Sequence, residues 1–381
     1  MMNRSVMLVF AIHIMLFCGT VFYAAAQYDK NIYASDKYIE EVDSNGLFVR
    51  IENASFLNNR EFFNPYQPGY TLIGYYLRPV VEFHPGKNTR LRAGAHLLKY
   101  SGLERFSQAV PVFSVHHRFY RGLDMMFGSL YGALDHDLIE PLFAFDRGFT
   151  NHNESGLQFL IDRGFIKADA WLNWEQFIFT GDPFREKFTA GFSSRIKIAG
   201  KSQLKVEIPL QFLVFHRGGQ IDTSPERMQN LLNYATGIDL TWDMANSVFN
   251  SFAFRGYLAG FRDMSGELQY PWDEGWAVYP NFIVRTSRLE AGIGYWTGAR
   301  FIAPLGEPVF QSVSAVDPEF TEEHRKLLTS KIVYQRELVR GIDMGLRFEV
   351  YYDLPAGRFD HSGGLQIIID HRFFITKLQR R

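Results

Sequence analysis

The sequence predicts an all-β fold, a transmembrane up-and-down antiparallel β-barrel of about sixteen strands. Three observations support this prediction. Stretches in which polar and apolar residues alternate recur along the chain, long apolar runs are confined to the N-terminus, and aromatic residues make up 16% of the chain. Alternation gives each strand one face for lipid and one for water, and aromatic residues suit the interfacial girdles of a barrel. About fourteen or about eighteen strands would also fit the pattern.

Composition excludes several other classes. The 40 lysines and arginines balance the 41 aspartates and glutamates, so nothing indicates a nucleic-acid partner. A helical membrane protein would need several apolar runs of roughly 20 residues, and the chain has a single such run. Two soluble β-sandwich domains are the remaining alternative, but they would not require the regular spacing of turns described below.

The single long apolar run reads as part of a signal peptide. Val6 to Val21 follows Arg4 and precedes the small residues 24–26. A positive residue, an apolar core and a small-residue cleavage site predict a cleaved signal peptide over residues 1–26, and hence export through the periplasm to the cell outer membrane. Cys18 lies within it, so we expect no disulfide in the mature chain.

The remainder is predicted to be one barrel with short ends. Residues 27–45 are polar and are expected to form a periplasmic lead-in. The barrel is expected over 46–376, and residues 377–381 are expected to form a periplasmic tail. The clearest alternation lies in the final stretch, where Gln366 and Asp370 fall on one face. We therefore predict that this stretch closes the barrel.

The expected strands follow one another at a steady rhythm. They are Gly46 to Phe56, Tyr70 to Phe83, Thr89 to Tyr100, a fourth strand between the link Gly102 to Ala109 and the turn at Arg121, Asp124 to Ala133, Gly156 to Arg163, Ile166 to Ile178, Lys187 to Ile198, Gln203 to Phe215, Leu232 to Trp242, Val248 to Gly260, Gly275 to Arg285, Arg288 to Arg300, Leu327 to Leu338, Ile342 to Tyr352 and Gly363 to Phe374.

Short and long connections alternate between these strands. Tight turns such as Pro85 to Asn88 carry the Pro, Gly and Asn residues that favour hairpins. Long links such as Leu134 to Ser155 and Phe301 to Lys326 fall between them. If the N-terminus lies in the periplasm, every tight turn is periplasmic and every long link is extracellular, which is the layout of bacterial outer-membrane barrels.

With this layout, nearly the whole mature chain resembles a Gram-negative outer-membrane β-barrel of the porin type. The closing strand, with Phe373 and Phe374 near its end, is the most specific part of the resemblance. In this class the last strand, usually ending in an aromatic residue, is what the barrel-assembly machinery reads. The resemblance therefore implies that Phe373 and Phe374 are the closure signal. Ile375 to Arg381, which follow them, depart from the usual ending.

The third outer loop, Leu134 to Ser155, is the main candidate for function. In porins the loop in this place folds into the lumen and sets the constriction, and acidic side chains facing a basic wall would filter solutes by size and charge. The alternative is a solvated loop that packs on its own aromatic residues. The candidate constriction residues are Asp135, His136, Asp137, Glu140, Asp146, Arg147 and Glu154.

Parity along the strands also assigns charged residues to the lumen wall. Their signs are mixed, so cross-strand ion pairs are a more natural role for them than solute binding. Glu82, which faces Arg90 or Arg92 across a tight turn, is the clearest expected pair. The candidate wall residues are Arg78, Glu82, Arg90, Arg92, His96, Arg118, Arg347 and Glu349.

The sequence gives no sign of a catalytic or metal site. A lipid hydrolase would need serine, histidine and a polar orienting group together at the lipid face. His117 and His371 are predicted to face lipid, but no serine pairs with either. Asp135, His136 and Asp137 have the donor types of a metal site at a spacing that matches no ligand motif. We therefore expect no enzyme activity, no metal and no cofactor.

The expected function is an outer-membrane channel for passive diffusion of small hydrophilic solutes, narrowed by the third outer loop. The alternative is a closed barrel that serves as a structural or accessory subunit of an outer-membrane complex. Expected partners are outer-membrane lipid and lipopolysaccharide, the barrel-assembly machinery during insertion, and a homo-oligomer or other complex partners. Residue patterns alone do not indicate the solute, the oligomeric state or whether the lumen is open.

Overall fold

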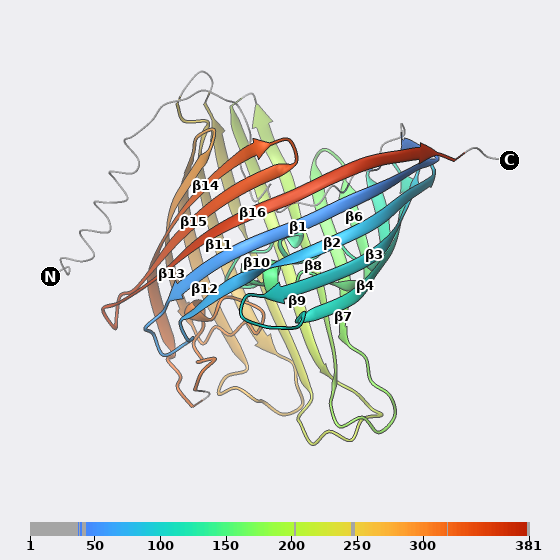
Figure 1. Ribbon diagram of the computed structural model, residues 1–381. Helices are drawn as coiled ribbons and strands as arrows, with labels where there is room; N and C mark the ends of the chain where they lie inside the picture. The colour runs from blue at the N-terminus through green and yellow to red at the C-terminus, as the bar shows by residue number, and fades with distance from the viewer. Residues whose placement is uncertain are drawn as a thin grey trace.

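The computed structural model describes residues 37, 39, 43–201, 203–244, 248–317 and 319–378. They form one closed barrel of sixteen antiparallel strands (Figure 1), in which each strand pairs with its neighbours in chain order. The pairing of β1 with β16 closes the ring over sixteen residues of β1, from Gly46 opposite Lys377 to Glu61 opposite His361. The predicted fold and strand count are therefore confirmed.

The strands are long enough to cross a bilayer at a tilt. Their bounds are β1 Gly46–Glu61, β2 Tyr70–Gly86, β3 Thr89–Tyr100, β4 Gln108–Tyr120, β5 Leu123–Ser129, β6 Ser155–Asp162, β7 Ile166–Gln176, β8 Glu186–Lys201, β9 Leu204–Gly218, β10 Gln229–Asp243, β11 Ser251–Asp263, β12 Glu274–Arg285, β13 Leu289–Ala299, β14 His324–Val339, β15 Ile342–Asp353 and β16 Arg358–Lys377. Short helical turns η3 (Ala133–His136), α2 (Arg147–Thr150) and η4 (Pro308–Phe310) lie in the loops.

Connections alternate between tight turns at one end of the barrel, here called the turn end, and longer loops at the other, the loop end. The turn between β4 and β5 shows why glycine is needed at such a place. Gly122 has a φ of 82°, and a Cβ on it would lie 2.1 Å from the backbone oxygen of Asp162 in the next turn. In barrels of this kind the turn end is periplasmic and the loop end is extracellular.

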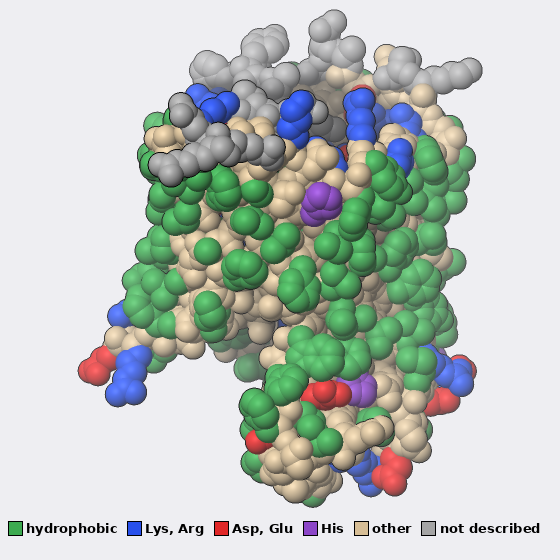
Figure 2. Space-filling view, turned by 90° about the vertical axis from the view of Figure 1, so that its right-hand side faces the viewer, with side chains coloured by type: hydrophobic (Ala, Val, Ile, Leu, Met, Phe, Trp, Pro, Cys, Tyr) green, Lys and Arg blue, Asp and Glu red, His purple; other side chains and the backbone are tan. Residues whose placement is uncertain are grey.

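The outer surface is apolar around the middle of the barrel. Large side chains such as Phe113, Phe127, Leu258 and Phe282 are more than half exposed. In Figure 2 hydrophobic side chains form a broad belt, and most charged side chains lie above it or on the loops below. Among the residues that the structure describes, no helix has the length and apolar character that a membrane crossing requires.

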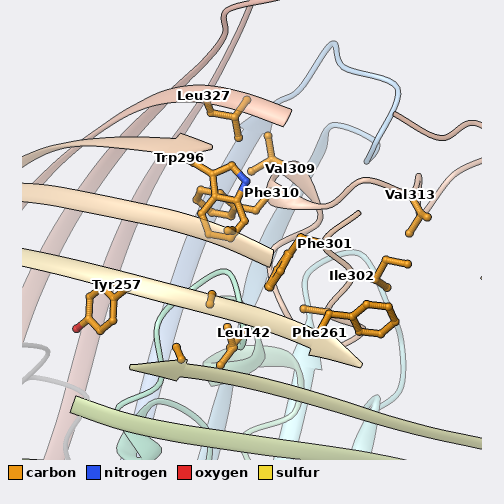
Figure 3. Packing of buried hydrophobic residues seen from close by; sticks show 14 of the residues in the cluster. Leu142, Tyr257, Phe261, Trp296, Phe301, Ile302, Val309, Phe310, Val313 and Leu327 are labelled. Carbon is orange, nitrogen blue, oxygen red and sulfur yellow. The ribbon is translucent and has the colours of Figure 1, made fainter. Parts of the chain in front are cut away.

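The loop-end half of the lumen is filled with apolar side chains. Leu231, Phe261, Trp296 and Leu327 project from the loop-end parts of β10 to β14. Phe301, Ile302, Val309, Phe310 and Val313 of loop 300–323 pack against them, and Figure 3 shows Phe310 and Val309 beside Trp296. Loop 300–323 therefore folds inward and fills this part of the barrel instead of projecting into solvent.

The predicted ends lie only partly within the described residues. The signal peptide, residues 1–26, falls outside them. Lys37 and Ile39, from the stretch expected as a periplasmic lead-in, lie inside the barrel. Lys37 Nζ donates to the backbone oxygen of Asp135 at 3.0 Å, and Arg118 donates to the backbone oxygen of Ile39 at 2.9 Å. This part of the lead-in therefore enters the lumen.

Candidate functional site

The loop between β5 and β6, residues 130–154, crosses the lumen and contacts both sides of the wall. His136 binds Asp169 of β7 at 3.0 Å, and at the opposite side Asp146 binds Arg60 of β1 at 2.9 Å. Because its polar side chains find partners on the wall, the loop can lie inside the barrel without leaving those charges unpaired. Asp146 of the loop thus faces a basic wall residue, and His136 faces an acidic one. That the loop narrows a solute path stays a prediction.

His136 is the most tightly enclosed residue of this loop. Its Nε2 lies 2.8 Å from Glu154 and its Nδ1 lies 3.0 Å from Asp169, and the ring stacks on Trp171 with centroids 3.6 Å apart. Burial alone would lower the pKa of His136, but the two carboxylates outweigh burial and raise it to about 9. The imidazolium therefore ties the two carboxylates together at neutral pH.

The acidic constriction residues bind cations of the wall or of the lead-in, and Arg147 lies near a wall carboxylate. Glu140 binds Lys331 at 2.5 Å and also contacts Arg347, which binds Glu349 at 2.7 Å. Asp137 binds Arg195 at 2.5 Å. Asp135 lies 3.3 Å from the ammonium of Lys37. Arg147 lies 3.9 Å from Glu175 and covers the ring of Phe143 at 4.9 Å.

The predicted wall residues other than Arg347 and Glu349 meet in two groups on the lumen side of β1 to β5. In the first, Glu52 accepts from Arg78 at 3.5 Å and from Arg92. Glu82 stands opposite Arg92 in the register, which agrees with the expected position. It also contacts His84 at 2.9 Å and Arg372 at 3.3 Å.

In the second group, Arg90 lies 3.3 Å from His116, whose other ring nitrogen lies 2.9 Å from Asp124. Arg118 also binds Asp124, at 3.0 Å. His96 is buried in the first group, and neither of its ring nitrogens has a partner among the described residues. These contacts agree with ion-pair networks as the main role of the wall charges.

The contacts leave two cavities in the lumen. One of about 830 Å³ lies toward the turn end and is bounded by Lys37, Asp135 and Asp169. The other, of about 160 Å³, lies between loop 130–154 and the wall around Tyr279. Asp137 and Arg195 line both cavities, so their ion pair separates the two spaces. Among the described residues, no group of three or more metal-binding side chains could hold a metal ion.

A polar stripe interrupts the lipid-facing surface on β1. Alternate residues of this strand, from Phe48 through Arg50 to Arg60, are buried toward the lumen, so the residues between them face outward. Toward the loop end the outward positions are polar except for Leu57. We call the polar ones the β1 polar stripe; they are Asn53, Ser55, Asn59 and Glu61. On an outer surface that is otherwise apolar at this depth, such a stripe is costly unless it binds something polar.

The part of the stripe nearest the loop end is connected by hydrogen bonds. Thr71 of β2 donates its hydroxyl to Asn59 Oδ1 at 2.5 Å, and Asn59 Nδ2 donates to Glu61 Oε1 at 2.8 Å. His361 of β16 stands directly opposite Glu61, and its Nδ1 is buried with no partner among the described residues. Opposite Asn59 lies Gly363, where a Cβ would lie 3.8 Å from the ring of Phe348. A carboxylate, an imidazole and an amide therefore meet at the lipid face.

The part of the stripe nearer the middle of β1 holds a serine. Ser55 is exposed, and its hydroxyl donates to Asn53 Oδ1 at 3.2 Å, while Asn53 Nδ2 donates to the backbone oxygen of Tyr76 at 2.6 Å. The outward histidines that the sequence identified, His117 and His371, lie instead near the turn end. Thr89 Oγ1 and His117 Nδ1 are 2.9 Å apart.

Comparison with known families decides the class of the protein. The model of the family described as Lipid A 3'-O-deacylase-type matches residues 39–378, which is almost all of the barrel. The chain belongs to the Lipid A 3'-O-deacylase-type family. No curated protein matches it. The family is defined by an enzyme activity, so the expectation of no enzyme activity is wrong.

Solved structures support the fold. The chain is similar to a loop-deletion mutant of OmpT from Vibrio cholerae, with a TM-score of 0.51, 10% identity and coverage of 86% of this chain and 100% of that one. It is also similar to OprD from Pseudomonas aeruginosa, with a TM-score of 0.50, 9% identity and coverage of 90% and 97%. Both are outer-membrane proteins. At these identities the likeness shows the fold alone, so the predicted porin-type barrel fold is confirmed.

Sequence reasoning missed the β1 polar stripe because it ended the first strand at Phe56 and began the last at Gly363. Asn59 and Glu61 then fell into a loop, and His361 into another. In the structure Asn58 and Arg60 face the lumen while Asn59 and Glu61 face outward, so both faces are polar here. A strand whose two faces are both polar does not show the expected contrast.

Proposed function

We propose that this deacylase-family barrel removes an ester-linked acyl chain from lipid A, the glycolipid of the outer leaflet, at the β1 polar stripe. The stripe supports this proposal because a carboxylate and an imidazole, groups that can activate water, face outward at the loop end of the barrel. The observation that carries it is the juxtaposition of Glu61 and His361 across the β1–β16 pair. An enzyme acting on a lipid embedded in the same membrane needs its reactive groups on the outer wall.

In the proposed reaction, Glu61 and His361 act on a water molecule at the ester. One of the two accepts the proton of the water as its oxygen bonds to the acyl carbon, and the sugar oxygen leaves with a proton. Asn59 holds one carboxylate oxygen of Glu61, and Thr71 in turn holds Asn59. This chain of hydrogen bonds orients the carboxylate as orienting groups do in other hydrolytic sites. Ser55, which is exposed nearer the middle of β1, would bind a polar group of the lipid.

The proposal is tested with purified barrel in vesicles that contain lipid A, with mass spectrometry of the lipid and of the released fatty acid. Wild type is expected to remove one acyl chain. Glu61→Gln and His361→Ala are each expected to slow release by about a hundredfold or more, the range for a lost general acid or base. His371→Ala is a matched control, since His371 faces outward from the same strand near the turn end. If Glu61→Gln and His361→Ala release fatty acid as fast as wild type and His371→Ala do, this site is excluded.

A solute channel is the second candidate, favoured by the cavity of about 830 Å³ that lies toward the turn end. Passage would require loops 130–154 and 300–323 to move away from the wall, because apolar side chains fill the loop-end half. Planar-bilayer recordings test it. Steady conductance of wild type at neutral pH would support a channel narrowed by loop 130–154. Its absence would favour the alternative, a closed barrel that serves as a structural or accessory subunit of an outer-membrane complex.

A further inference from the structure

A second polar site interrupts the lipid face on the side of the barrel away from β1. At the loop end of β7 to β10, four outward residues stand directly opposite one another across successive strand pairs. They are Trp174, Phe188, His216 and Asn230. β9, which carries His216, is eight strands from β1 in a ring of sixteen, so this row is remote from the β1 polar stripe.

The imidazole of His216 is held in one orientation. Its ring stacks on Phe188 with centroids 4.5 Å apart, and Phe188 stacks in turn on Trp174 at 5.3 Å. Its Nδ1 lies 2.6 Å from Asn230 Oδ1. Because an amide oxygen only accepts hydrogen bonds, Nδ1 carries the proton, and in the neutral ring Nε2 keeps a lone pair. Nε2 is therefore a hydrogen-bond acceptor.

The surroundings leave that acceptor accessible next to a negative charge. Residue 218, two positions along the same face, is glycine, and a Cβ there would lie 2.6 Å from Nε2. Glu186 stands opposite Gly218 on β8, and its carboxylate oxygen lies 3.8 Å from Nε2. Within the described part of the chain, no lysine or arginine lies within ion-pair distance of Glu186.

We propose that His216 and Glu186 bind the primary ammonium group of a lipid head group in the outer leaflet. Two acceptors 3.8 Å apart can be bridged by one nitrogen that donates a hydrogen bond of about 2.8–2.9 Å to each. The charge of Glu186 favours a cation over a neutral hydroxyl. Trp174 and Met228, 40% and 48% exposed, border the row and provide apolar contact for the rest of the lipid.

The test is native mass spectrometry of the intact barrel with lipids that differ only in the head group. Dioleoyl phosphatidylethanolamine carries an ammonium that donates, and dioleoyl phosphatidylcholine carries a cation without N–H donors. We expect wild type to retain the ethanolamine lipid about tenfold more strongly, as a charge-assisted hydrogen bond implies. Equal retention of the two lipids would overturn the proposal. Because the measurement needs no turnover, it is independent of the deacylase proposal.

Three variants make the assignment specific. Glu186→Gln and His216→Phe are expected to abolish the preference, and Gly218→Ala is expected to do the same by occupying the space beside Nε2. His371→Phe, at an outward histidine near the turn end, should keep it. Each variant is checked for the heat-modifiable mobility of a folded barrel. A preference that persists in folded Glu186→Gln, or displacement of the lipid by free ethanolamine at equal concentration, would refute a lipid-binding site here.

Discussion

Arg60 on β1 donates two hydrogen bonds to Glu307 in loop 300–323, at 2.6 and 2.9 Å, across 247 positions of sequence. Both side chains are almost completely buried, and Arg60 also binds Asp146 of loop 130–154. One guanidinium therefore ties both inward-folded loops to the strand that closes the barrel. The loops also meet each other, since the backbone N–H of Glu307 donates to the backbone oxygen of Glu140.

Replacing Arg60 by alanine should destabilise the barrel strongly, because it leaves two buried carboxylates without their cation. Loss of one partner of a buried ion pair costs about 3–5 kcal/mol of unfolding free energy. Urea unfolding of the barrel in detergent micelles measures it. Arg262→Ala, which breaks an exposed pair with Glu274, is the control and should cost less than about 1 kcal/mol. Similar costs for the two variants would contradict the buried tie.

Trp296 keeps the loop end closed by packing. It is fully buried and contacts both Phe301 and Phe310, with ring centroids 5.0 and 5.1 Å away. Trp296→Ala should cost about 3–5 kcal/mol and leave a void under loop 300–323. We expect this variant to give transient conductance in planar bilayers that wild type lacks. Trp242→Ala, at an exposed tryptophan of β10, should give none. Identical recordings for Trp296→Ala and wild type would show that the packing of Trp296 does not keep the loop end closed.

The ion pairs of His136 predict a pH dependence. Because its pKa is raised in the folded protein to about 9, the imidazolium contributes stability fully below the unfolded pKa of roughly 6.5. That contribution is lost as pH rises through about 9. Thermal unfolding midpoints of wild type should therefore fall between pH 7 and pH 10 more than those of His136→Gln. Parallel pH profiles for the two proteins would show that His136 is not charged in the folded state.

Thr71 is predicted to act through Asn59. Thr71→Val removes the hydroxyl that holds the Asn59 amide, and the amide then holds Glu61 less firmly. Deacylation should slow by about tenfold, less than for loss of Glu61 itself, with the larger change in kcat. Thr71→Ser keeps a donor and should restore most of the rate. If valine and serine give the same rate, the hydrogen-bonded chain does not orient the carboxylate.

Much of the barrel followed from the sequence because its physics is local. Alternation along β16 and the glycine- and proline-containing tight turns place each strand within a few residues of its observed bounds. The largest differences lie at the loop end. β1 continues to Glu61 and β16 begins at Arg358, because both faces of these strand ends are polar and show no alternation.

The candidate site depends on contacts that periodicity does not encode. Asp137 and Glu140 could be assigned to a loop inside the lumen, but their partners Arg195 and Lys331 lie on strands far along the chain. Glu61 and His361 are 300 positions apart and become neighbours only when the barrel closes. The sequence prediction also considered only a serine nucleophile beside His117 or His371. The stripe instead presents a carboxylate and an imidazole, which suit activation of water.

Incubation of the purified barrel with lipid A vesicles in ¹⁸O-labelled water tests the central claim most directly. If water activated at the β1 polar stripe cleaves the ester, the released fatty acid from wild type carries one ¹⁸O atom, and Glu61→Gln releases almost none. Intact lipid A after incubation with folded wild type, or labelled fatty acid released equally by Glu61→Gln, would contradict the account.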